Sequence, residues 1–364
     1  MNDIGVIVIG RNEGERLRRC LASVAGRGLP VVYVDSASTD GSASLARAMG
    51  VEVVDLDMSL PFSAARARNE GFERLVRIAP GVKFVQFVDG DCEIVDGWLD
   101  RARLELGRAP RVAVVCGRRR ERFPGASVYN RLADLEWDTP VGEADSCGGD
   151  AMMRVDTFRS VNGFDASVVA GEEPELCQRL RAGGWKVLRV GAEMTLHDSA
   201  MLSFAQWWKR AVRSGYGAAD VAARFGERGL FVNAVRSARR WAVEWQSLLV
   251  ATLSLAVIAC LTRPLGGPWS FAFKAAASGA ALVALMLPLQ MARVAVRARR
   301  RTPDWHTALA YGVLTMIGKW PNYQGQAQYR RDRRAGKNTR MIEYKQPARI
   351  APGLTPSPSG RGQG

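Results

Sequence analysis

Short apolar runs alternate with amphipathic stretches along the first 120 residues of the chain. Five runs rich in valine, isoleucine and phenylalanine have the length of a buried strand, at residues 4–9, 31–34, 51–56, 84–88 and 112–116. Amphipathic stretches with helical spacing of their apolar residues separate these runs, at residues 17–24, 42–49, 64–78 and 98–106. The alternation predicts an α/β fold whose mostly parallel sheet has helices on both faces. Ligands of such sheets bind beyond the carboxyl ends of the strands, so the residues that follow each strand are candidates for a functional site.

The pattern becomes less regular from about residue 120 to 235, where residues 173–182 form the one clear helix. Residues 245–262 and 275–292 then each run for 18 positions without a charge. As a helix each stretch would extend roughly 27 Å, close to the thickness of a bilayer's hydrocarbon core. Two transmembrane helices are therefore expected, and a pair of buried core helices is the alternative.

The segments around these apolar stretches predict a membrane hairpin. The loop at 263–274 contains prolines and glycines, and the stretch at 305–318 is too short to span, so we expect an interfacial or re-entrant helix there. We expect three regions: an α/β domain over 1–235, a membrane region over 236–320, and a basic tail over 321–364. The tail is partly disordered in this interpretation, since the residues beyond 346 are rich in proline, glycine and serine.

The net positive charge of the chain at first suggests a nucleic-acid partner instead of a membrane. The 364 residues include 51 Lys and Arg against 36 Asp and Glu, a formal net charge of +15, which is typical of proteins that bind nucleic acids. Much of the excess, however, lies at 236–240 and 293–301, beside the apolar stretches. Basic residues in such positions mark the cytoplasmic side of a membrane. We therefore expect no nucleic-acid partner and a multi-pass protein of the inner (cytoplasmic) membrane, with the α/β domain and both termini on the cytoplasmic side.

The cysteine spacing and the N-terminal residues exclude few further classes of protein. The 6 cysteines form no CxxC pair, which argues against a zinc finger. The apolar stretch from Ile4 is only as long as a strand, so a cleavable signal peptide is not expected.

The strongest candidate for chemistry is the sequence Asp89-Gly90-Asp91, directly after the strand at 84–88. Two carboxylates at the edge of a parallel sheet suit a hard divalent cation such as Mg²⁺ or Mn²⁺. An Asp-Gly surface turn is the simpler explanation of the same residues.

Polar residues also follow the other strands, and this favours a shared site. They are Arg11, Asn12 and Glu13 after the first strand, Asp35, Ser36 and Asp40 after the second, and Arg66 and Asn69 after the third. Because all these clusters converge on one edge of the sheet, helix capping alone does not account for them.

Seven segments, in this order and at this spacing, resemble the family-2 glycosyltransferases, which have the Rossmann-like GT-A fold. They are VIVIGRNEG (6–14), VDSASTDGS (34–42), AARARNEG (64–71), DGD (89–91), GGDAMMR (148–154), GFD (163–165) and GEEPELCQRL (171–180). The resemblance covers residues 4–215 and implies a domain that binds a nucleotide-diphosphate sugar.

The resemblance also implies roles for individual residues. Nucleotide-pocket residues would be Asn12, Glu13, Asp35 and Asp40, with Arg11, Ser36, Arg66 and Asn69 as further substrate contacts. The metal would be held by Asp89 and Asp91, and Gly148-Gly149 would form the glycine-rich loop beside donor and acceptor. A histidine after the acidic helix often completes the metal site in this family, which implies His197, although a lone histidine is more often structural.

The acidic pair Glu172-Glu173 matches the catalytic acids of the family. Its second member would be the general base that deprotonates the acceptor hydroxyl, which implies Glu173, with Glu172 and Glu175 left as alternatives. The alternative explanation is structural: the two acids only stabilise the helix by lying at the positive end of its dipole. Arg210 could balance diphosphate charge or lie on a solvated helix face.

These observations predict a membrane-anchored, metal-dependent, inverting hexosyltransferase that uses a nucleotide-diphosphate sugar. Its acceptor would be lipid-linked or a growing polysaccharide, as in cell-surface or exopolysaccharide synthesis, and membrane lipids would be partners. The alternatives are a polyprenyl-phosphate glycosyltransferase, a sugar nucleotidyltransferase and an inactive membrane scaffold. A dehydrogenase is excluded because GxGxxG does not follow the first strand.

Overall fold

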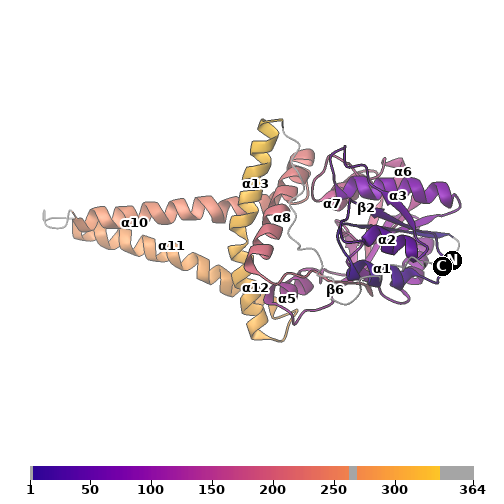
Figure 1. Ribbon diagram of the computed structural model, residues 1–364. Helices are drawn as coiled ribbons and strands as arrows, with labels where there is room; N and C mark the ends of the chain where they lie inside the picture. Colours follow the sequence, from indigo (N-terminus) through magenta and orange to yellow (C-terminus); the bar gives the residue numbers. More distant parts are fainter. Residues whose placement is uncertain (1–2, 262–268, 337–364) are drawn as a thin grey trace, which may run out of the picture.

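The computed structural model describes residues 3–261 and 269–336. An α/β domain forms one end of the molecule, and a long helical hairpin projects from the other end (Figure 1). Several helices lie across the base of the hairpin, between it and the domain (Figure 1). This arrangement puts the carboxyl edge of the sheet close to the helices that carry the hairpin.

The first half of the nine-stranded sheet is parallel, as predicted. Strands β1 (Ile4–Gly10), β2 (Val31–Asp35), β3 (Glu52–Asp55) and β4 (Phe84–Asp89) lie in the order β3-β2-β1-β4, with β1 pairing in register with both β2 and β4. Residues on both faces of β1 are buried, so the sheet is covered on both sides. The predicted α/β class is confirmed.

The second half of the sheet is mixed. Strand β8 (Ala151–Arg154) runs antiparallel to β4 and to β6 (Val112–Glu121), and β6 runs parallel to β9 (Lys186–His197). The short strands β5 (Cys92–Ile94) and β7 (Gly142–Ala144) both pair antiparallel with β9. The antiparallel strand β8 carries the chain back to the edge where β4 ends.

Helices connect and cover the strands. They are α1 (Glu15–Val24), α2 (Ser42–Ala48), α3 (Ala64–Ile78), α4 (Trp98–Arg108), α5 (Val128–Glu136), α6 (Val155–Ser160) and α7 (Glu172–Ala182). The helices predicted at 17–24, 42–49, 64–78, 98–106 and 173–182 correspond to α1, α2, α3, α4 and α7. Helices α5 and α6 have no counterpart in the sequence prediction.

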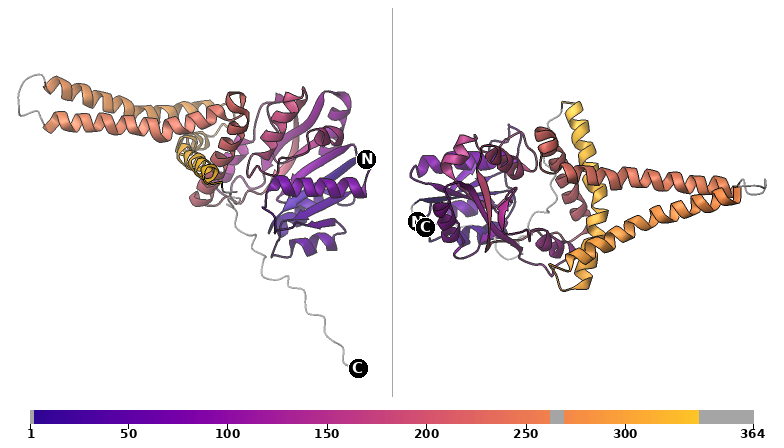
Figure 2. Two further views of the ribbon diagram at one scale, coloured as in Figure 1. Left: turned by 90° about the horizontal axis from the view of Figure 1, so that it is seen from above. Right: turned by 180° about the vertical axis from the view of Figure 1, so that it is seen from behind.

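The C-terminal part is entirely helical in the described residues. Helix α8 (Phe204–Phe225) is followed by η1 (Gly226–Arg228), α9 (Val232–Arg239), the π-helical turn η2 (Arg240–Glu244) and α10 (Trp245–Leu261). Helix α11 (Trp269–Ala298) returns beside α10 in all three views (Figures 1 and 2). Helices α12 (Trp305–Ile317) and α13 (Lys319–Arg334) then lie with α8 across the base of the hairpin (Figure 1).

Two helical segments, Val232–Leu261 and Lys274–Ala298, are long and apolar enough to cross a membrane. Only 11% and 17% of the residues in their apolar windows are buried, whereas a core helix would be mostly enclosed by the fold. Helix α11 begins at Trp269, earlier than the predicted end of the loop at 274. The rest of that loop, and the tail predicted beyond residue 346, lie outside the described residues.

The predicted region boundaries fall inside helices. The boundary at 235/236 lies within α9, and the one at 320/321 lies within α13. Residues 321–334, which were assigned to the basic tail, belong to α13, and α13 packs along α8.

Helices α8 and α13 touch through glycines. A Cβ at Gly215 of α8 would overlap the backbone of Asn322 in α13, and one at Gly325 of α13 would overlap the backbone of Val212 in α8. On its other side, α8 meets the segment before α7, because a Cβ at Gly217 would lie 2.5 Å from the carbonyl oxygen of Ala170. The two contacts hold α8 between the α/β domain and α13.

Gly215→Ala is expected to lower the free energy of unfolding by about 1–3 kcal/mol, the usual range for overpacking a tight contact. Gly107→Ala is the matched control, because Gly107 is also helical but has open space around its Cβ position. The control should be neutral or stabilising by up to about 1 kcal/mol, since alanine favours helix over glycine. Thermal unfolding of the full chain in detergent measures both, and equal stability of the two variants would contradict the close contact.

Candidate active site

A cavity of about 640 Å³ lies between the carboxyl edge of the sheet and the helices at the base of the hairpin. Its sheet side is formed by the ends of β1, β4 and β9 and by the start of α7. Its other side is formed by α8, α9 and α13. Of the residues singled out in the sequence, the cavity wall contains Arg11, Asn12, Glu13, Ser36, Asp89, Asp91, Glu172, Glu173, His197 and Arg210.

Arg68 is the central cation on the sheet side. This residue of α3 is only 2% exposed, and its guanidinium binds three carboxylates. Nη1 lies 2.7 Å from Oε1 of Glu172, while Nη2 lies 2.8 Å from Oδ1 of Asp89 and 3.0 Å from Oε1 of Glu173. Burial alone would lower the pKa of Arg68, but the three carboxylates outweigh this and raise the pKa above its usual value. The guanidinium therefore stays charged and ties α3, β4 and α7 together.

A second buried cluster holds the other side of Asp89. Arg119 of β6 donates from Nε to Oδ2 of Asp150 at 3.0 Å, and its Nη2 lies 3.4 Å from Oδ2 of Asp89. Asp150, which is fully buried, also accepts hydrogen bonds from the Thr195 hydroxyl at 2.6 Å and from the Asp89 backbone N–H at 3.1 Å. Both oxygens of Asp89 are thus oriented by arginines.

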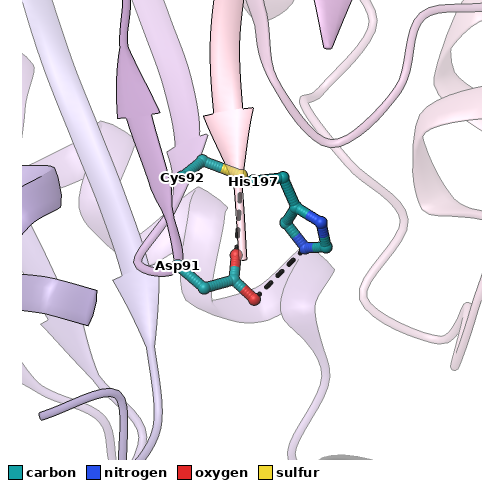
Figure 3. Close-up of side chains that lie close together, drawn as sticks. All are labelled: Asp91, Cys92 and His197. Atoms are coloured by element: carbon teal, nitrogen blue, oxygen red, sulfur yellow. Dashed lines mark hydrogen bonds and ion pairs between the residues drawn. The ribbon is translucent and has the colours of Figure 1, made fainter. Parts of the chain in front are cut away.

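Asp91 and His197 form a separate pair. Oδ2 of Asp91 lies 3.3 Å from Nε2 of His197, and the Cys92 thiol donates to Oδ1 of Asp91 at 3.5 Å (Figure 3). The His197 and Trp137 rings pack in a T-shaped arrangement, with ring centroids 4.8 Å apart. Burial and the Asp150 charge raise the pKa of Cys92, so its sulfur remains a thiol and a weak ligand for hard cations.

The predicted metal set Asp89, Asp91 and His197 is divided between two clusters. Ligand atoms of Asp91, Cys92 and His197 lie within 4.8 Å of one another, and so do those of Asp89, Cys92 and Asp150. Among the described residues, Asp91 with His197 is therefore the oxygen and nitrogen pair best placed for a cation at the cavity wall.

The three candidate acids at the start of α7 have different environments. Glu175 is buried against Arg179, whose Nε and Nη2 each lie 2.7 Å from its carboxylate oxygens. The Glu172 side chain is 4% exposed, whereas the Glu173 side chain is 15% exposed, and both line the cavity. Burial raises the pKa of Glu173 to about 7, and the neighbouring Glu172 charge adds to this, although Arg68 opposes it.

The loops after β1 and β2 brace each other. The Asn12 backbone N–H donates to the Ser38 hydroxyl at 2.8 Å, and the Asn12 side chain accepts from the Thr39 N–H at 2.7 Å. The Asp35 carboxylate is buried and accepts from the Tyr33 hydroxyl and the Ser38 N–H, both at 2.8 Å. Asp40 accepts from the Ser42 N–H at 3.0 Å at the start of α2. The Asp35 and Asp40 side chains thus support the loops from outside the cavity wall.

Four other residues that were predicted to contact the substrate interact with other residues of the protein. The Asn69 side chain donates to the carbonyl of Phe164 at 2.7 Å and accepts from its N–H at 3.0 Å, which fixes the loop before α7. Arg66 donates to the carbonyls of Pro61 and Asp57. At the cavity wall, Glu13 pairs with Arg16 at 2.8 Å, and Arg210 pairs with Glu136 at 3.0 Å.

A side chain at position 149 would displace the side chains of Asp89 and Arg119. A Cβ there would be 2.6 Å from Oδ2 of Asp89 and 3.0 Å from Nη2 of Arg119. At the neighbouring Gly148 the same Cβ position has open space. The predicted glycine-rich loop therefore approaches the acidic site through Gly149.

The sequence alone predicts no role for Arg68, Arg119 or Asp150. Arg68 had a signal, because it lies four residues from both Ala64 and Phe72 on the buried face of α3. A charged residue on an apolar helix face needs a buried partner of opposite charge. Arg119 and Asp150 had no comparable signal, since their pairing follows from the β6–β8–β9 arrangement.

Residues 5–162 match the family model described as "Glycosyl transferase family 2". This segment is a family 2 glycosyltransferase domain. The chain is also similar to the "Pre-mycofactocin glycosyltransferase" of two strains of Mycobacterium tuberculosis, with 28% identity over 244 residues. That match covers 62% of this chain and 49% of the relatives, so the chain spans about half the length of these curated relatives.

A solved structure supports the fold beyond the glycosyltransferase domain. "Mannosyltransferase PcManGT from Pyrobaculum calidifontis in complex with GDP-Man and Mn2+" has a TM-score of 0.53 and 19% sequence identity. The similarity covers 86% of this chain and 87% of that chain. At this identity the similarity shows the GT-A fold alone.

Gly149→Ala should nearly abolish turnover of the glycosyltransferase domain, because the added Cβ forces Asp89 and Arg119 apart while the core remains intact. Gly148→Ala, one residue away, should keep nearly full turnover. Initial rates with the preferred nucleotide sugar measure the difference, and circular dichroism checks the fold of both variants. Equal activity would mean that the loop adopts another conformation in the working enzyme.

Proposed function

We propose that the protein is a membrane-anchored, metal-dependent, inverting glycosyltransferase that moves a sugar from a nucleotide-diphosphate donor to a lipid-linked or polysaccharide acceptor. One observation carries the proposal. A single cavity contains the Asp91–His197 pair, the half-buried acid Glu173, and side chains from the helices that carry the apolar hairpin.

Asp91 and His197 are the residues proposed to hold a divalent cation, with Asp89 alongside. Converging carboxylate and imidazole groups suit Mn²⁺ or Mg²⁺, and both side chains already point at one place on the cavity wall. A cation bound there would offset the negative charge of the departing diphosphate. The structurally similar mannosyltransferase was solved with Mn²⁺ and GDP-Man, which supports this choice. Arg119 and Arg68 add fixed positive charge beside Asp89.

The nucleotide is proposed to bind at the braced loops after β1 and β2. Arg11, Asn12, Glu13 and Ser36 line the cavity there. Their backbone is held by the Asn12–Ser38 and Asp35–Ser38 hydrogen bonds, so these polar groups are oriented before a ligand arrives.

Glu173 is proposed as the general base. It is the more exposed member of the acidic pair, whereas Glu172 is almost fully enclosed against Arg68. A carboxyl whose pKa lies at about 7 is well matched to accepting a proton near neutral pH. With the donor's diphosphate on one side of the sugar and the base on the other, attack by the acceptor hydroxyl would invert the anomeric carbon.

The hairpin is proposed to anchor the enzyme in the inner membrane, with the glycosyltransferase domain on the cytoplasmic side. The apolar side chains of α10 and α11 are largely exposed, and the basic residues 297–301 lie at the end of the hairpin nearest the domain. Helices α8, α12 and α13, which cross the hairpin base, would lie along the membrane surface (Figure 1).

Asp91→Asn should reduce transfer nearly to background, because an amide is a much weaker ligand for a hard cation than a carboxylate. Excess EDTA should do the same to the unmodified enzyme, and Mn²⁺ should restore it. Transfer from a panel of nucleotide sugars, with and without chelator, measures both effects. Full activity in EDTA would remove the metal from the mechanism.

Glu173→Gln should lower turnover roughly 10²- to 10⁴-fold while leaving donor affinity near its original value, since a positioned base contributes about that factor. Because the base must be ionised, the unmodified enzyme should gain rate as the pH rises through about 7. The Gln variant should lose this dependence. Rates across neutral pH, beside calorimetric titration of the donor, make the test.

Glu172→Gln serves as the comparison for the base. It should disturb the Arg68 cluster and reduce turnover, but the rise of rate with pH should remain because Glu173 is still present. If Glu173→Gln kept its rate and the unmodified enzyme showed no rise of rate through about pH 7, the nucleophile would be an acceptor group that needs no deprotonation, such as a phosphate. If the variant kept both its rate and the rise with pH, another residue would be the base.

A further inference from the structure

The helical side of the cavity carries its own set of polar side chains. Arg213 extends from α8, and Lys319, Asn322 and Gln326 lie on one face of α13 at helical spacing. All four line the same cavity as Asp91 and Glu173. The two sets therefore face each other from different parts of the fold, since α8 and α13 lie between the domain and the hairpin (Figure 1).

Two of these side chains are cations that no acidic group among the described residues neutralises. Four other arginines of the cavity wall bind carboxylates: Arg16, Arg68, Arg119 and Arg210. Within residues 3–261 and 269–336, no acidic group lies within ion-pair distance of Arg213 or Lys319. Burial lowers the pKa of Lys319, so the ammonium group has lost water without gaining a counter-charge. An anionic ligand would supply that counter-charge.

The start of the helix that leads into the hairpin also forms part of the cavity wall. Phe231 and Ala234 line it, and they lie at the start of the continuous helical segment Val232–Leu261. Helix α9 also contacts both α8 and α13, so a ligand bound to Arg213 and Lys319 shares the cavity with the start of the helix that leads into the apolar hairpin. This combination of cations and an adjoining apolar helix matches an amphiphile with a charged head.

We infer that Arg213 and Lys319 bind the phosphate of a lipid-linked acceptor, whose hydrocarbon chain leaves the cavity beside Phe231 and α9. The inference rests on the proposed function and specifies its acceptor. The phosphate lies on the helical side, and the acceptor's sugar hydroxyl extends toward Glu173 on the sheet side. Asn322 and Gln326 supply neutral hydrogen bonds to the same head group.

Binding of farnesyl phosphate to the full chain in detergent tests the site directly. The unmodified protein should bind farnesyl phosphate more tightly than either farnesol or inorganic phosphate. Arg213→Gln and Lys319→Gln should each weaken binding on the order of 10- to 100-fold, the range for losing a charge-assisted hydrogen bond. Lys319→Arg keeps the charge and should retain most of the affinity, which separates charge loss from misfolding.

Lys209→Gln is the matched control, because Lys209 is an exposed cation of α8 outside the cavity wall. It should leave farnesyl phosphate binding unchanged. Two results would overturn the inference: equal affinity for inorganic phosphate and farnesyl phosphate, or unchanged affinity in both Gln variants.

Binding of UDP or GDP with Mn²⁺ to the same variants separates this inference from the proposed function. Arg213→Gln and Lys319→Gln should leave nucleotide affinity unchanged, whereas Asp91→Asn should weaken it. If the Gln variants lost nucleotide and kept farnesyl phosphate, the two cations would belong to the donor site and the inference would be wrong. If no variant affected nucleotide binding, the donor site itself would be misplaced while the lipid result still stood.

Discussion

Three carboxylates from two separate elements share the guanidinium of Arg68, and the geometry of the site depends on this shared cation. Asp89 comes from the end of β4, and Glu172 and Glu173 come from the first turn of α7. Without a cation between them, three acids this close would repel one another and take up protons. Loss of one partner from a buried ionic group generally costs about 3–5 kcal/mol. Arg68 therefore offsets the repulsion among these acids and sets the distance between the strand end and the acidic helix.

The sequence was informative wherever a local pattern determines structure. Apolar runs located the parallel strands β1 to β4 and both hairpin helices, because burial in a sheet or a bilayer needs an unbroken apolar stretch. The rule that strand ends form one edge predicted that Asp89 and Asp91 would lie near the residues after β1, and Asn12, Glu13, Asp89 and Asp91 do line one cavity. Glu173 and His197, which the family resemblance implied, line the same cavity.

The sequence was less informative about which polar group faces the cavity. Asp35, Asp40 and Asn69 were expected to contact substrate, yet their side chains hold backbone N–H groups of nearby loops. A pattern of residue types cannot distinguish an acid that supports a loop from one that faces a ligand. The Arg68–Glu172 pair joins positions 104 residues apart, and the antiparallel return of β8 is what places Asp150 beside Arg119. These contacts follow from the tertiary arrangement, so no periodic pattern in the sequence indicates them.

Gly215 and Gly217 of α8 also affect the dimensions of the cavity. Residues two apart on a helix point roughly 200° apart, so these two glycines leave opposite sides of α8 bare, one against α13 and the other against Ala170. Helix α8 thus acts as a spacer with its side chains removed on both contact surfaces. The gap between the acids of α7 and Lys319 of α13 is set by the width of a helical backbone, so this helix determines how long a molecule must be to contact both.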